Sequence, residues 1–287
     1  MNLSLCIITC RDNYILDKLF KSIKVFQDSF KEIILVIDYR YRKKDGRDLP
    51  KYLNEFQSLI LLEYDGSKNL PGMRNLAIKK SNSKYIWFID DDSSISLSIK
   101  PGLKKLISLL DSAPEVGFVG TKIIEKRNKK TLKKILYKPV IHPIKGPLFS
   151  FGLNQEFLLR KDFPTVRIKN IKFPKINIVQ GTSMLFRTNL LKKVNGFNED
   201  LNRGYASFED SEMGLYLSSL GYLGIYTDYI SVHHYKEKRA HSGSRDGINP
   251  KFVFGRVKNY SITNLDNTNN NFINSFFKSL NYSIYVS

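Results

Sequence analysis

Cysteine and long apolar runs are both scarce in this sequence. The 287 residues include two cysteines, Cys6 and Cys10, which lie four positions apart with no second pair elsewhere. This spacing supports neither a disulfide framework nor a zinc site, so we interpret both as small buried side chains. No stretch approaches the roughly 20 apolar residues of a membrane span, and the run from Met1 to Thr9 has no basic region of a signal peptide. These absences are typical of a protein of the reducing cytosol.

Sequence motifs that identify several large enzyme classes are also missing. The chain contains no GxGxxG, GxxxxGK[ST], GxSxG or HExxH segment. Their absence argues against a Rossmann oxidoreductase, a P-loop NTPase, a serine hydrolase and a zinc protease. A metal site built from carboxylates on an α/β sheet remains compatible with the sequence.

Acidic residues are under-represented, and the positive charge is unevenly distributed. The chain has 46 Lys and Arg against 27 Asp and Glu, which gives a net charge of +19. Between Lys122 and Lys175, 15 basic residues stand against 3 acidic ones, a net charge of +12 in 54 residues. Such a segment is either a solvated face or a surface for an anionic partner, such as nucleic acid, anionic lipid or a phosphorylated substrate.

Short apolar runs alternate with helical patterns, most clearly in the first half of the chain. The apolar runs predict strands at 3–9, 32–38, 59–63, 84–89, 115–121, 178–187, 223–227 and 230–233. Helical spacing predicts helices near 15–23, 75–81, 103–110, 188–194 and 208–220. This alternation indicates an α/β fold with a doubly wound, mostly parallel sheet flanked by helices. The basic segment at 122–177 shows no regular pattern and is interpreted as a less regular insertion.

Three adjacent carboxylates directly follow one of the predicted strands. Asp90, Asp91 and Asp92 come after the run KYIWFI, and ligands of parallel sheets bind outside the carboxyl ends of the strands. Because neighbouring carboxylates repel one another, a hard divalent cation is expected to bind here, with phosphate oxygens in its remaining positions. His233 and His234 follow another predicted strand, and either could supply an imidazole to the same cation.

Two further polar clusters suggest binding or catalysis. Glu209, Asp210 and Glu212 begin the helix predicted at 208–220, where carboxylates either cap free backbone N–H groups or act as a general base for an acceptor hydroxyl. Arg74 and Asn75 follow Leu70-Pro71-Gly72 at the entry of another predicted helix. A guanidinium beside free backbone amides is suited to a diphosphate.

In combination, these segments resemble glycosyltransferase family 2, whose members have the GT-A fold. The resemblance covers roughly residues 3–235. The matching segments are Thr9-Cys10-Arg11, Asp38, Pro71-Gly72-Met73-Arg74-Asn75, Phe88-Ile89-Asp90-Asp91-Asp92, Gln180 to Arg187, Gly196-Phe197-Asn198-Glu199, Glu209-Asp210 and Val232-His233-His234. The second strand departs from the family pattern, because Asp38-Tyr39-Arg40-Tyr41 stands where the family usually has Asp-Asp-Gly-Ser. This departure leaves the preference for a nucleotide base open.

The resemblance implies an inverting glycosyltransferase that moves a sugar from a nucleoside diphosphate to an acceptor hydroxyl. It places the chain in bacterial-type polysaccharide or glycoconjugate synthesis. Asp92 and Asp90 would hold Mn²⁺ or Mg²⁺, with His233 or His234 as a further ligand, and Asp210 would be the catalytic base beside Glu209. Donor nucleotide contacts would come from Thr9, Arg11, Asp38, Arg74, Asn75 and Asp90, and Gly181 and Thr182 would lie on the acceptor side.

The same resemblance suggests a division of the chain and a set of partners. Residues 1–121 would form the nucleotide-sugar-binding half, 122–235 the acceptor-binding and catalytic half of the same domain, and 236–287 a C-terminal extension. UDP-sugars are the commonest donors of the family, and dTDP- and GDP-sugars remain open. A glycan or lipid-linked acceptor is expected, and the basic segment suggests an anionic surface at the inner face of a membrane.

Two other functions remain open from the sequence. A nucleotidyltransferase would share the sheet and a metal-bound nucleotide, but it usually has a glycine-rich basic loop after the first strand. Here that position contains Thr9-Cys10-Arg11-Asp12-Asn13. A nucleic-acid-binding protein would use the basic segment at 122–175, yet no recognised binding motif accompanies it, so nucleic acid is not an expected partner.

Overall fold

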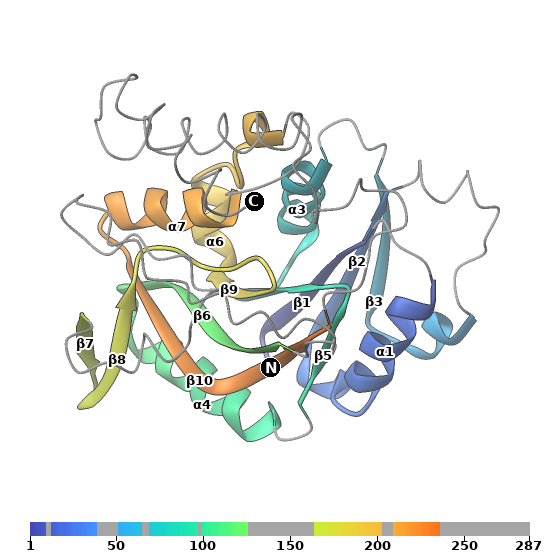
Figure 1. The fold of residues 1–287 in the computed structure, drawn as a ribbon, viewed down its shortest axis with the longest axis horizontal. Helices are drawn as coiled ribbons and strands as arrows, with labels where there is room; N and C mark the ends of the chain where they lie inside the picture. Colours follow the sequence, from blue (N-terminus) through green and yellow to red (C-terminus); the bar gives the residue numbers. More distant parts are fainter. Residues whose placement is uncertain are drawn as a thin grey trace, which may run out of the picture.

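A mixed, mostly parallel sheet forms the centre of the molecule, with helices on both faces (Figure 1). The computed structural model describes residues 1–9, 13–38, 51–64, 69–96, 99–125, 164–202 and 209–235. Within these ranges the strand order is β3-β2-β1-β4-β9-β6-β10-β8-β7, and β5 pairs with β10 off this path. The predicted α/β class with a mostly parallel, helix-flanked sheet is confirmed.

The strands are β1 Leu3–Thr9, β2 Glu32–Asp38, β3 Leu59–Tyr64, β4 Tyr85–Asp90, β5 Ser93–Ile95, β6 Val116–Glu125, β7 Thr165–Ile168, β8 Ile171–Ile176, β9 Ser183–Arg187 and β10 Leu223–His234. The helices are α1 Asn13–Lys24, α3 Asn69–Lys80, α4 Ile99–Ser112, α6 Thr188–Lys193 and α7 Glu209–Ser219. Short 3₁₀ turns lie at Gln27–Ser29, Lys51–Glu55 and Glu199–Asn202. In the described part of the chain, no helix has the length and apolar character needed to cross a bilayer.

Continuous apolar runs form the central strands because these strands are covered on both faces. β1 pairs in parallel with β2 and β4, and nearly every residue of all three strands is buried. One face packs against α1 and α4 through residues such as Phe20 and Leu106, and the other against α3, α6 and α7 through residues such as Ala77 and Met213 (Figure 1). Parallel strands bring their carboxyl ends to one edge of the sheet, where the predicted polar residues lie.

Strands β5, β8 and β9 run opposite to the parallel strands, and β9 is important for the site. β9 is antiparallel to both β4 and β6, and its first residue, Ser183, pairs with Ile89 near the end of β4. Residues just before Ser183 therefore lie at the same edge as the carboxyl end of β4. This reversal places Gly181 and Thr182 next to Asp90.

Several predicted element boundaries were wrong. The helix predicted at 75–81 begins at Asn69, because Pro71 in the first turn lacks only an N–H that has no helical partner there. The strands predicted at 223–227 and 230–233 form one strand, β10, with an irregular register against β6 between Thr227 and Ser231. The strand predicted at 178–187 begins only at Ser183.

A hairpin lies within the segment for which no regular element was predicted. β7 and β8 are joined at Lys169 and Asn170, which have φ values of 46° and 66°. Two consecutive residues with positive φ are typical of a two-residue hairpin turn. The predicted donor contact Arg11, residues 126–163 of the basic segment and the extension 236–287 lie outside the described residues.

Candidate active site

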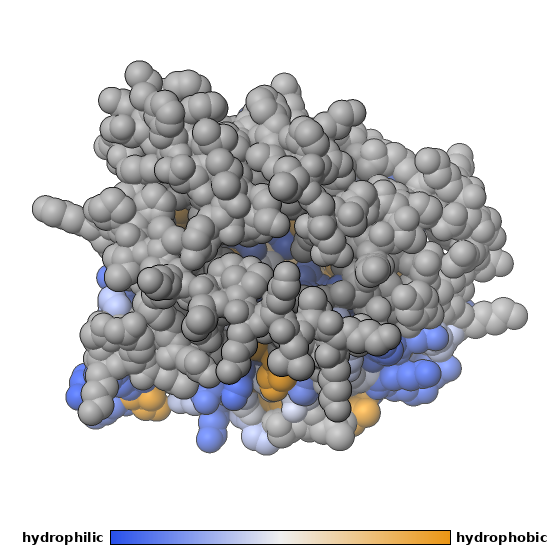
Figure 2. All heavy atoms as spheres, in the orientation of Figure 1, coloured by the Kyte–Doolittle hydropathy of each residue, from blue (hydrophilic) through white to orange (hydrophobic). Residues whose placement is uncertain are grey.

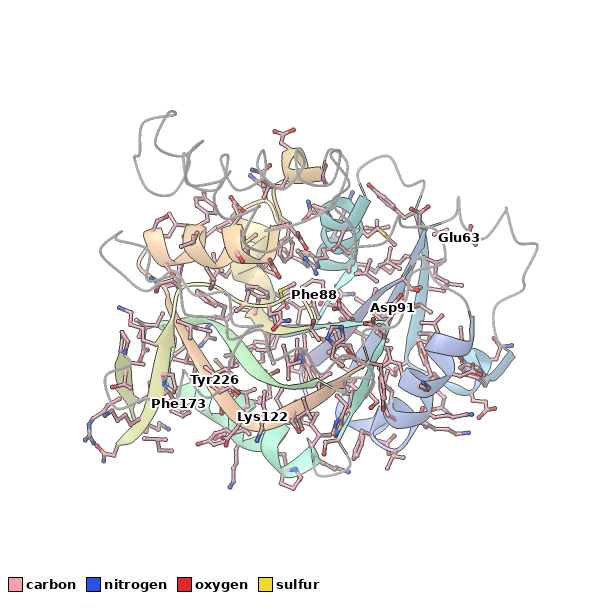
Figure 3. All side chains as sticks on the ribbon, in the orientation of Figure 1. Glu63, Phe88, Asp91, Lys122, Phe173 and Tyr226 are labelled. Atoms are coloured by element: carbon pink, nitrogen blue, oxygen red, sulfur yellow. The ribbon has the colours of Figure 1, made fainter. Side chains whose placement is uncertain are left out.

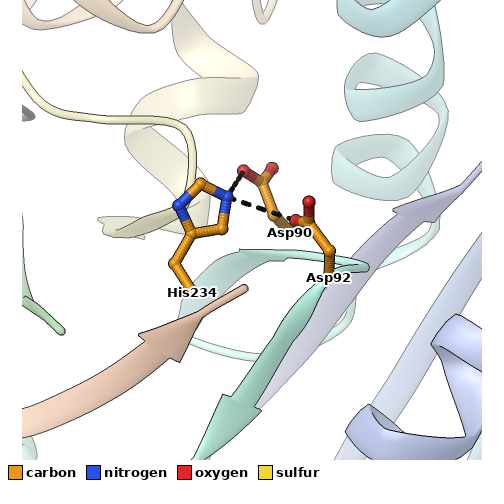
Figure 4. Close-up of side chains that lie close together, drawn as sticks. All are labelled: Asp90, Asp92 and His234. Atoms are coloured by element: carbon orange, nitrogen blue, oxygen red, sulfur yellow. Dashed lines mark ion pairs between the residues drawn. The ribbon is translucent and has the colours of Figure 1, made fainter. Parts of the chain in front are cut away.

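Two carboxylates and an imidazole meet at the carboxyl edge of the sheet (Figure 4). Asp90 ends β4, Asp92 follows in the next turn, and His234 ends β10. The Nε2 atom of His234 lies 3.3 Å from Oδ1 of Asp92 and 3.9 Å from Oδ2 of Asp90. The short strand β5 holds this arrangement, because Ser93 pairs with His234 across the strands.

The cluster has the ligand atoms and the spacing that a divalent cation requires. One ligand atom from each of Asp90, Asp92 and His234 lies within 4.8 Å of the others. The Asp92 side chain is only 2% exposed, whereas that of Asp90 is 31% exposed and accessible to a ligand. Carboxylate oxygens with one imidazole nitrogen suit Mn²⁺ and related divalent ions, so these residues fit such a cation.

His233 and Asp91 are adjacent in sequence to residues of the cluster, but their side chains point away from it. Side chains alternate along a strand, so His233, which pairs with Ser94, points away from the face that His234 occupies. Among the described residues, the cluster therefore includes His234 and not His233. Asp91 is buried at the end of β4 (Figure 3), and its Oδ2 atom accepts a hydrogen bond of 2.8 Å from Oγ1 of Thr9. The hydroxyl that was predicted to contact the donor thus joins β1 to the turn after β4.

Asp210 lies in the first turn of α7, and its carboxylate is held by backbone N–H groups. The N–H of Gly181 donates to Oδ2 at 2.6 Å, and the N–H of Ser211 lies 2.7 Å from Oδ1. The pKa of Asp210 is raised to about 6, chiefly because the carboxyl is removed from water and also because the Glu209 carboxylate lies nearby. The Arg74 guanidinium and the two backbone donors act in the opposite direction. Such a carboxyl is ionised at neutral pH and more basic than an ordinary aspartate.

Arg74 and Glu209 form a buried ion pair that joins α3 to α7. The Nη1 atom of Arg74 lies 2.6 Å from Oε1 of Glu209, and both side chains are at most 5% exposed. The guanidinium also lies over the ring of Phe197, 5.2 Å from its centroid. The residue that was predicted to contact the donor diphosphate is therefore directed toward the Glu209–Asp210 pair.

Asn75 connects α3 to the turn that contains Phe197. Its Nδ2 atom donates to the Phe197 carbonyl and to Glu199, both at 2.9 Å, and its Oδ1 atom accepts from the Phe197 N–H at 2.7 Å. Sequence reasoning missed this role for Phe197 and Glu199. The segment Gly196-Phe197-Asn198-Glu199 was visible as a motif, but its partner Asn75 lies 122 positions away from Phe197.

Asp38 is buried at the end of β2, on the same edge of the sheet as Thr9.

Gly181 and Thr182 link the cluster to the Asp210 carboxylate. Gly181 contacts Asp210, and the hydroxyl of Thr182 donates to Oδ2 of Asp90 at 2.9 Å. The Asp90 N–H in turn donates to the Thr182 carbonyl at 3.2 Å. Two consecutive residues, whose Cα atoms are about 3.8 Å apart, therefore contact Asp210 and the cluster.

Gly181 has no room for a side chain. A Cβ atom at this position would lie 2.6 Å from Nη2 of Arg74 and 3.2 Å from Oδ2 of Asp210. On the adjoining side, a small pocket is lined by Gly120, Thr121, Ile123, Val179, Gln180, Ser183 and Tyr226. The edge of the sheet thus combines a candidate cation site, a positioned carboxylate and an adjoining pocket.

Comparison with known proteins identifies the family of this chain. A family model described as "Glycosyl transferase family 2" matches residues 4–194. The chain belongs to this family. It is a glycosyltransferase that uses a nucleotide sugar. This assignment agrees with the function that the resemblance implied and not with a nucleotidyltransferase or a nucleic-acid-binding protein.

Solved structures show that the chain shares its fold with known glycosyltransferases. S. aureus TarS 1-349 in complex with UDP-GlcNAc has a TM-score of 0.55 at 16% identity, covering 100% of this chain and 72% of that one. The mannosyltransferase PcManGT from Pyrobaculum calidifontis, in complex with GDP-Man and Mn²⁺, has a TM-score of 0.58 at 14% identity, covering 99% and 73%. At these identities the likeness concerns the fold. No curated protein sequence matches the chain.

Proposed function

We propose that this enzyme binds a nucleoside diphosphate sugar through a divalent cation at Asp90, Asp92 and His234. Asp210 then accepts the proton of an acceptor hydroxyl, and the sugar is transferred with inversion. The observation that carries this proposal is the contact of consecutive residues with both parts of the site, since Gly181 meets Asp210 and Thr182 meets Asp90. A base and a cation site at such adjacent positions suit a single displacement between them.

Asp210 has a defined role in this displacement. As the acceptor oxygen attacks the anomeric carbon, its proton passes to the Asp210 carboxylate and the bond from the sugar to the diphosphate breaks. Attack from the face opposite the diphosphate inverts the anomeric centre. The N–H groups of Gly181 and Ser211 hold the carboxylate in one orientation, so little reorganisation is needed during proton transfer.

The carboxylates of Asp90 and Asp92 would hold the cation, with His234 as the third ligand. When bound, Mn²⁺ or Mg²⁺ offsets the negative charge that develops on the leaving diphosphate, so the chain needs no general acid there. Thr9, Arg11 and Asp38 remain candidates for contacts with the nucleotide. Residues 1–121 would supply the donor half of the domain and residues 122–235 the acceptor half.

The donor is expected to be a UDP-sugar, with GDP- and dTDP-sugars as the alternatives. TarS was solved with UDP-GlcNAc and PcManGT with GDP-Man and Mn²⁺, which supports a nucleoside diphosphate sugar and a divalent ion. Thermal shifts with UDP, GDP and dTDP, each with Mn²⁺ and with EDTA, test the proposal. One nucleotide should raise the Tm in Mn²⁺ only, and no Mn²⁺-dependent rise with any of them would contradict it.

The pH dependence of the reaction should report the ionisation of Asp210. Because the carboxyl must be ionised to accept a proton, kcat/KM should fall about tenfold per pH unit below the pKa of about 6. Glu209→Gln removes a negative charge that raises this pKa and frees the Arg74 guanidinium, which lowers it. Both changes lower the pKa, so the acid limb should move to lower pH.

The measurement is kcat/KM against pH at saturating Mn²⁺ for wild type and Glu209→Gln. Asp200→Asn, which removes a carboxylate at the 3₁₀ turn Glu199–Asn202, is the control and should leave the limb in place. An acid limb that stays unchanged in Glu209→Gln would mean that another group limits activity at low pH.

A methyl group at Gly181 should disturb the site without removing any functional group. The added Cβ of Gly181→Ala displaces Arg74 or Asp210, both of which are held by close contacts. A displacement of about 1 Å in an active site can lower turnover by roughly 100-fold. We expect kcat to fall at least about tenfold at an unchanged affinity for UDP. A kcat equal to that of wild type would show that the contact between Gly181 and Asp210 is dispensable.

The acceptor is proposed to be a glycan or a lipid-linked glycan, used by an enzyme bound peripherally to the inner face of a membrane. The net charge of +19 and the +12 of residues 122–175 support attraction to an anionic surface. This part of the proposal concerns location and is independent of the chemistry at Asp210.

A further inference from the structure

We propose that the β7–β8 hairpin and the neighbouring side of α4 form a docking surface for an anionic lipid bilayer. The inference extends the proposed membrane location by assigning it to particular residues. It does not depend on the identity of the donor or of the catalytic base.

The hairpin has four cations and no acidic residue. Between Pro164 and Ile176 the basic residues are Arg167, Lys169, Lys172 and Lys175, and all four are exposed. A segment of 13 residues with four positive charges produces a positive potential that attracts anionic headgroups. The hairpin also carries the outermost strand on its side of the sheet, β7, so it projects from the domain (Figure 1).

Two of these cations lie opposite each other, and the hairpin has no acidic residue to neutralise their charges. Arg167 pairs with Lys172 across the strands, an arrangement in which like charges destabilise a hairpin. The other face supplies the stability, because Ile168 and Phe173 are buried in the core. An anionic surface would relieve the repulsion between Arg167 and Lys172. Without such a surface, the buried face of the hairpin offsets this repulsion.

An apolar side chain lies at the tip of the hairpin, on the face that carries Ile168 and opposite to the face of Arg167 and Lys172. Ile171 directly follows the turn at Lys169 and Asn170 and is 46% exposed. A bilayer interface accommodates both features, since cations meet the phosphates while the apolar group enters the boundary of headgroups and acyl chains. A soluble polyanion or a nucleic acid would meet the charges only.

The side of α4 that adjoins the hairpin adds cations next to Phe173, on the hairpin face opposite to that of Arg167 and Lys172. Lys105 lies over the ring of Tyr229, 6.0 Å from its centroid, and the same ring contacts Phe173 of β8 at 5.9 Å. Lys104 is exposed on the same helix, and Asp228 contributes one exposed carboxylate beside Tyr229. Hydrophilic side chains with apolar ones between them lie along this lower edge of the molecule (Figure 2). Phe173 marks the position of the hairpin there (Figure 3).

Charges on an edge strand have another known use, which is to prevent pairing with a second sheet. That use accounts for cations on β7 and β8. It does not account for an exposed isoleucine at the tip or for the cations of α4, and both of these are expected of a membrane contact.

The test compares a charge-reversal variant of the hairpin with a charge-reversal variant of α3 and α6. Arg167→Glu/Lys172→Glu changes the hairpin, and Lys79→Glu/Lys193→Glu applies the same change of charge to the exposed ends of α3 and α6. Full-length proteins are sedimented with vesicles of phosphatidylcholine alone or mixed with phosphatidylglycerol, at low and high salt. Circular dichroism and thermal unfolding check that each variant is folded.

Wild type and the α3/α6 variant should bind phosphatidylglycerol vesicles at low salt and release them at high salt. Each cation near an anionic surface strengthens binding by roughly fivefold, so the hairpin variant should bind at least about twentyfold more weakly. Ile171→Ser should weaken the binding that persists at intermediate salt. Equal loss in both charge variants, or no preference of wild type for phosphatidylglycerol, would overturn the proposal.

Hydrolysis of the nucleotide sugar in solution separates this proposal from the proposed function. The hairpin variant should hydrolyse the donor as fast as wild type, since the hairpin contributes no residue to the site. An enzyme that binds vesicles through the hairpin but hydrolyses no nucleotide sugar would contradict the proposed chemistry and leave the docking surface intact. A wild type that binds nucleic acid through Arg167 and Lys172 but not vesicles would contradict the docking surface alone.

Discussion

Replacing Asp210 with Asn should lower turnover by about 10²–10⁴-fold, the usual range for the loss of a general base. The variant keeps the shape of the side chain and one acceptor for the N–H groups of Gly181 and Ser211. What it loses is the capacity to accept a proton from the acceptor hydroxyl. The measurement is kcat with the acceptor substrate, together with the affinity for UDP and Mn²⁺, which should stay close to the wild-type values.

Glu212→Gln is the matched control for Asp210→Asn. Glu212 is a buried carboxylate in the same first turn of α7, so both substitutions remove one negative charge from one helix end. We expect Glu212→Gln to retain turnover within a few-fold of wild type. If instead Asp210→Asn is nearly as active as wild type, the assignment is wrong, and Glu209 and Glu212 become the candidates for the base.

Replacing Asp92, the buried carboxylate of the cation cluster, should have the second largest effect, which is on the Mn²⁺-dependent binding of nucleotide. Asp92→Asn removes a negative charge that lies 3.3 Å from His234 and is 2% exposed, so no solvent-exposed group can replace it. We expect the Mn²⁺-dependent part of nucleotide affinity to fall at least about 100-fold, since even residues outside the ligand set can affect metal affinity by 10–100-fold. Calorimetry of UDP binding with Mn²⁺ and with EDTA measures this directly.

Asp91→Asn provides a control in the adjacent residue. Asp91 is also buried, but its carboxylate accepts the hydroxyl of Thr9. This variant should unfold at a lower temperature, because it weakens a buried hydrogen bond between β1 and the turn after β4, yet its Mn²⁺ dependence should be retained. UDP binding that is equally tight in Mn²⁺ and in EDTA for the wild type would contradict a cation role for the whole cluster.

The sequence predicted the parts of the fold that depend on local patterns. β1 and β2 are continuous apolar runs, and their predicted ranges, 3–9 and 32–38, coincide with the strands of the structure. Such runs are recognisable because every position of a central parallel strand is buried. The β7–β8 hairpin was missed because its exposed cations and Pro174 interrupt the alternation that usually marks a strand.

The site was only partly predictable for a different reason. Three adjacent aspartates showed that a polar cluster follows β4, but the sequence does not show that Asp91 faces Thr9 while Asp90 and Asp92 face His234. That division depends on the turn after β4 and on the pairing of β5 with β10. Arg74 likewise matched a donor motif, and its pairing with Glu209 depends on the packing of α3 beside α7. Both are results of tertiary structure rather than of local pattern.

The antiparallel insertion of β9 has a consequence for how the enzyme folds. Arg74 meets Glu209 across 135 positions of the chain, and Thr182 meets Asp90 across 92. Contacts between distant residues form only after long loops have closed at an entropic cost. Because Gly181 and Thr182 directly precede β9, the complete site forms only once β9 has entered between β4 and β6. A nucleotide and its cation that bind this site consequently stabilise the complete sheet against every intermediate that lacks β9.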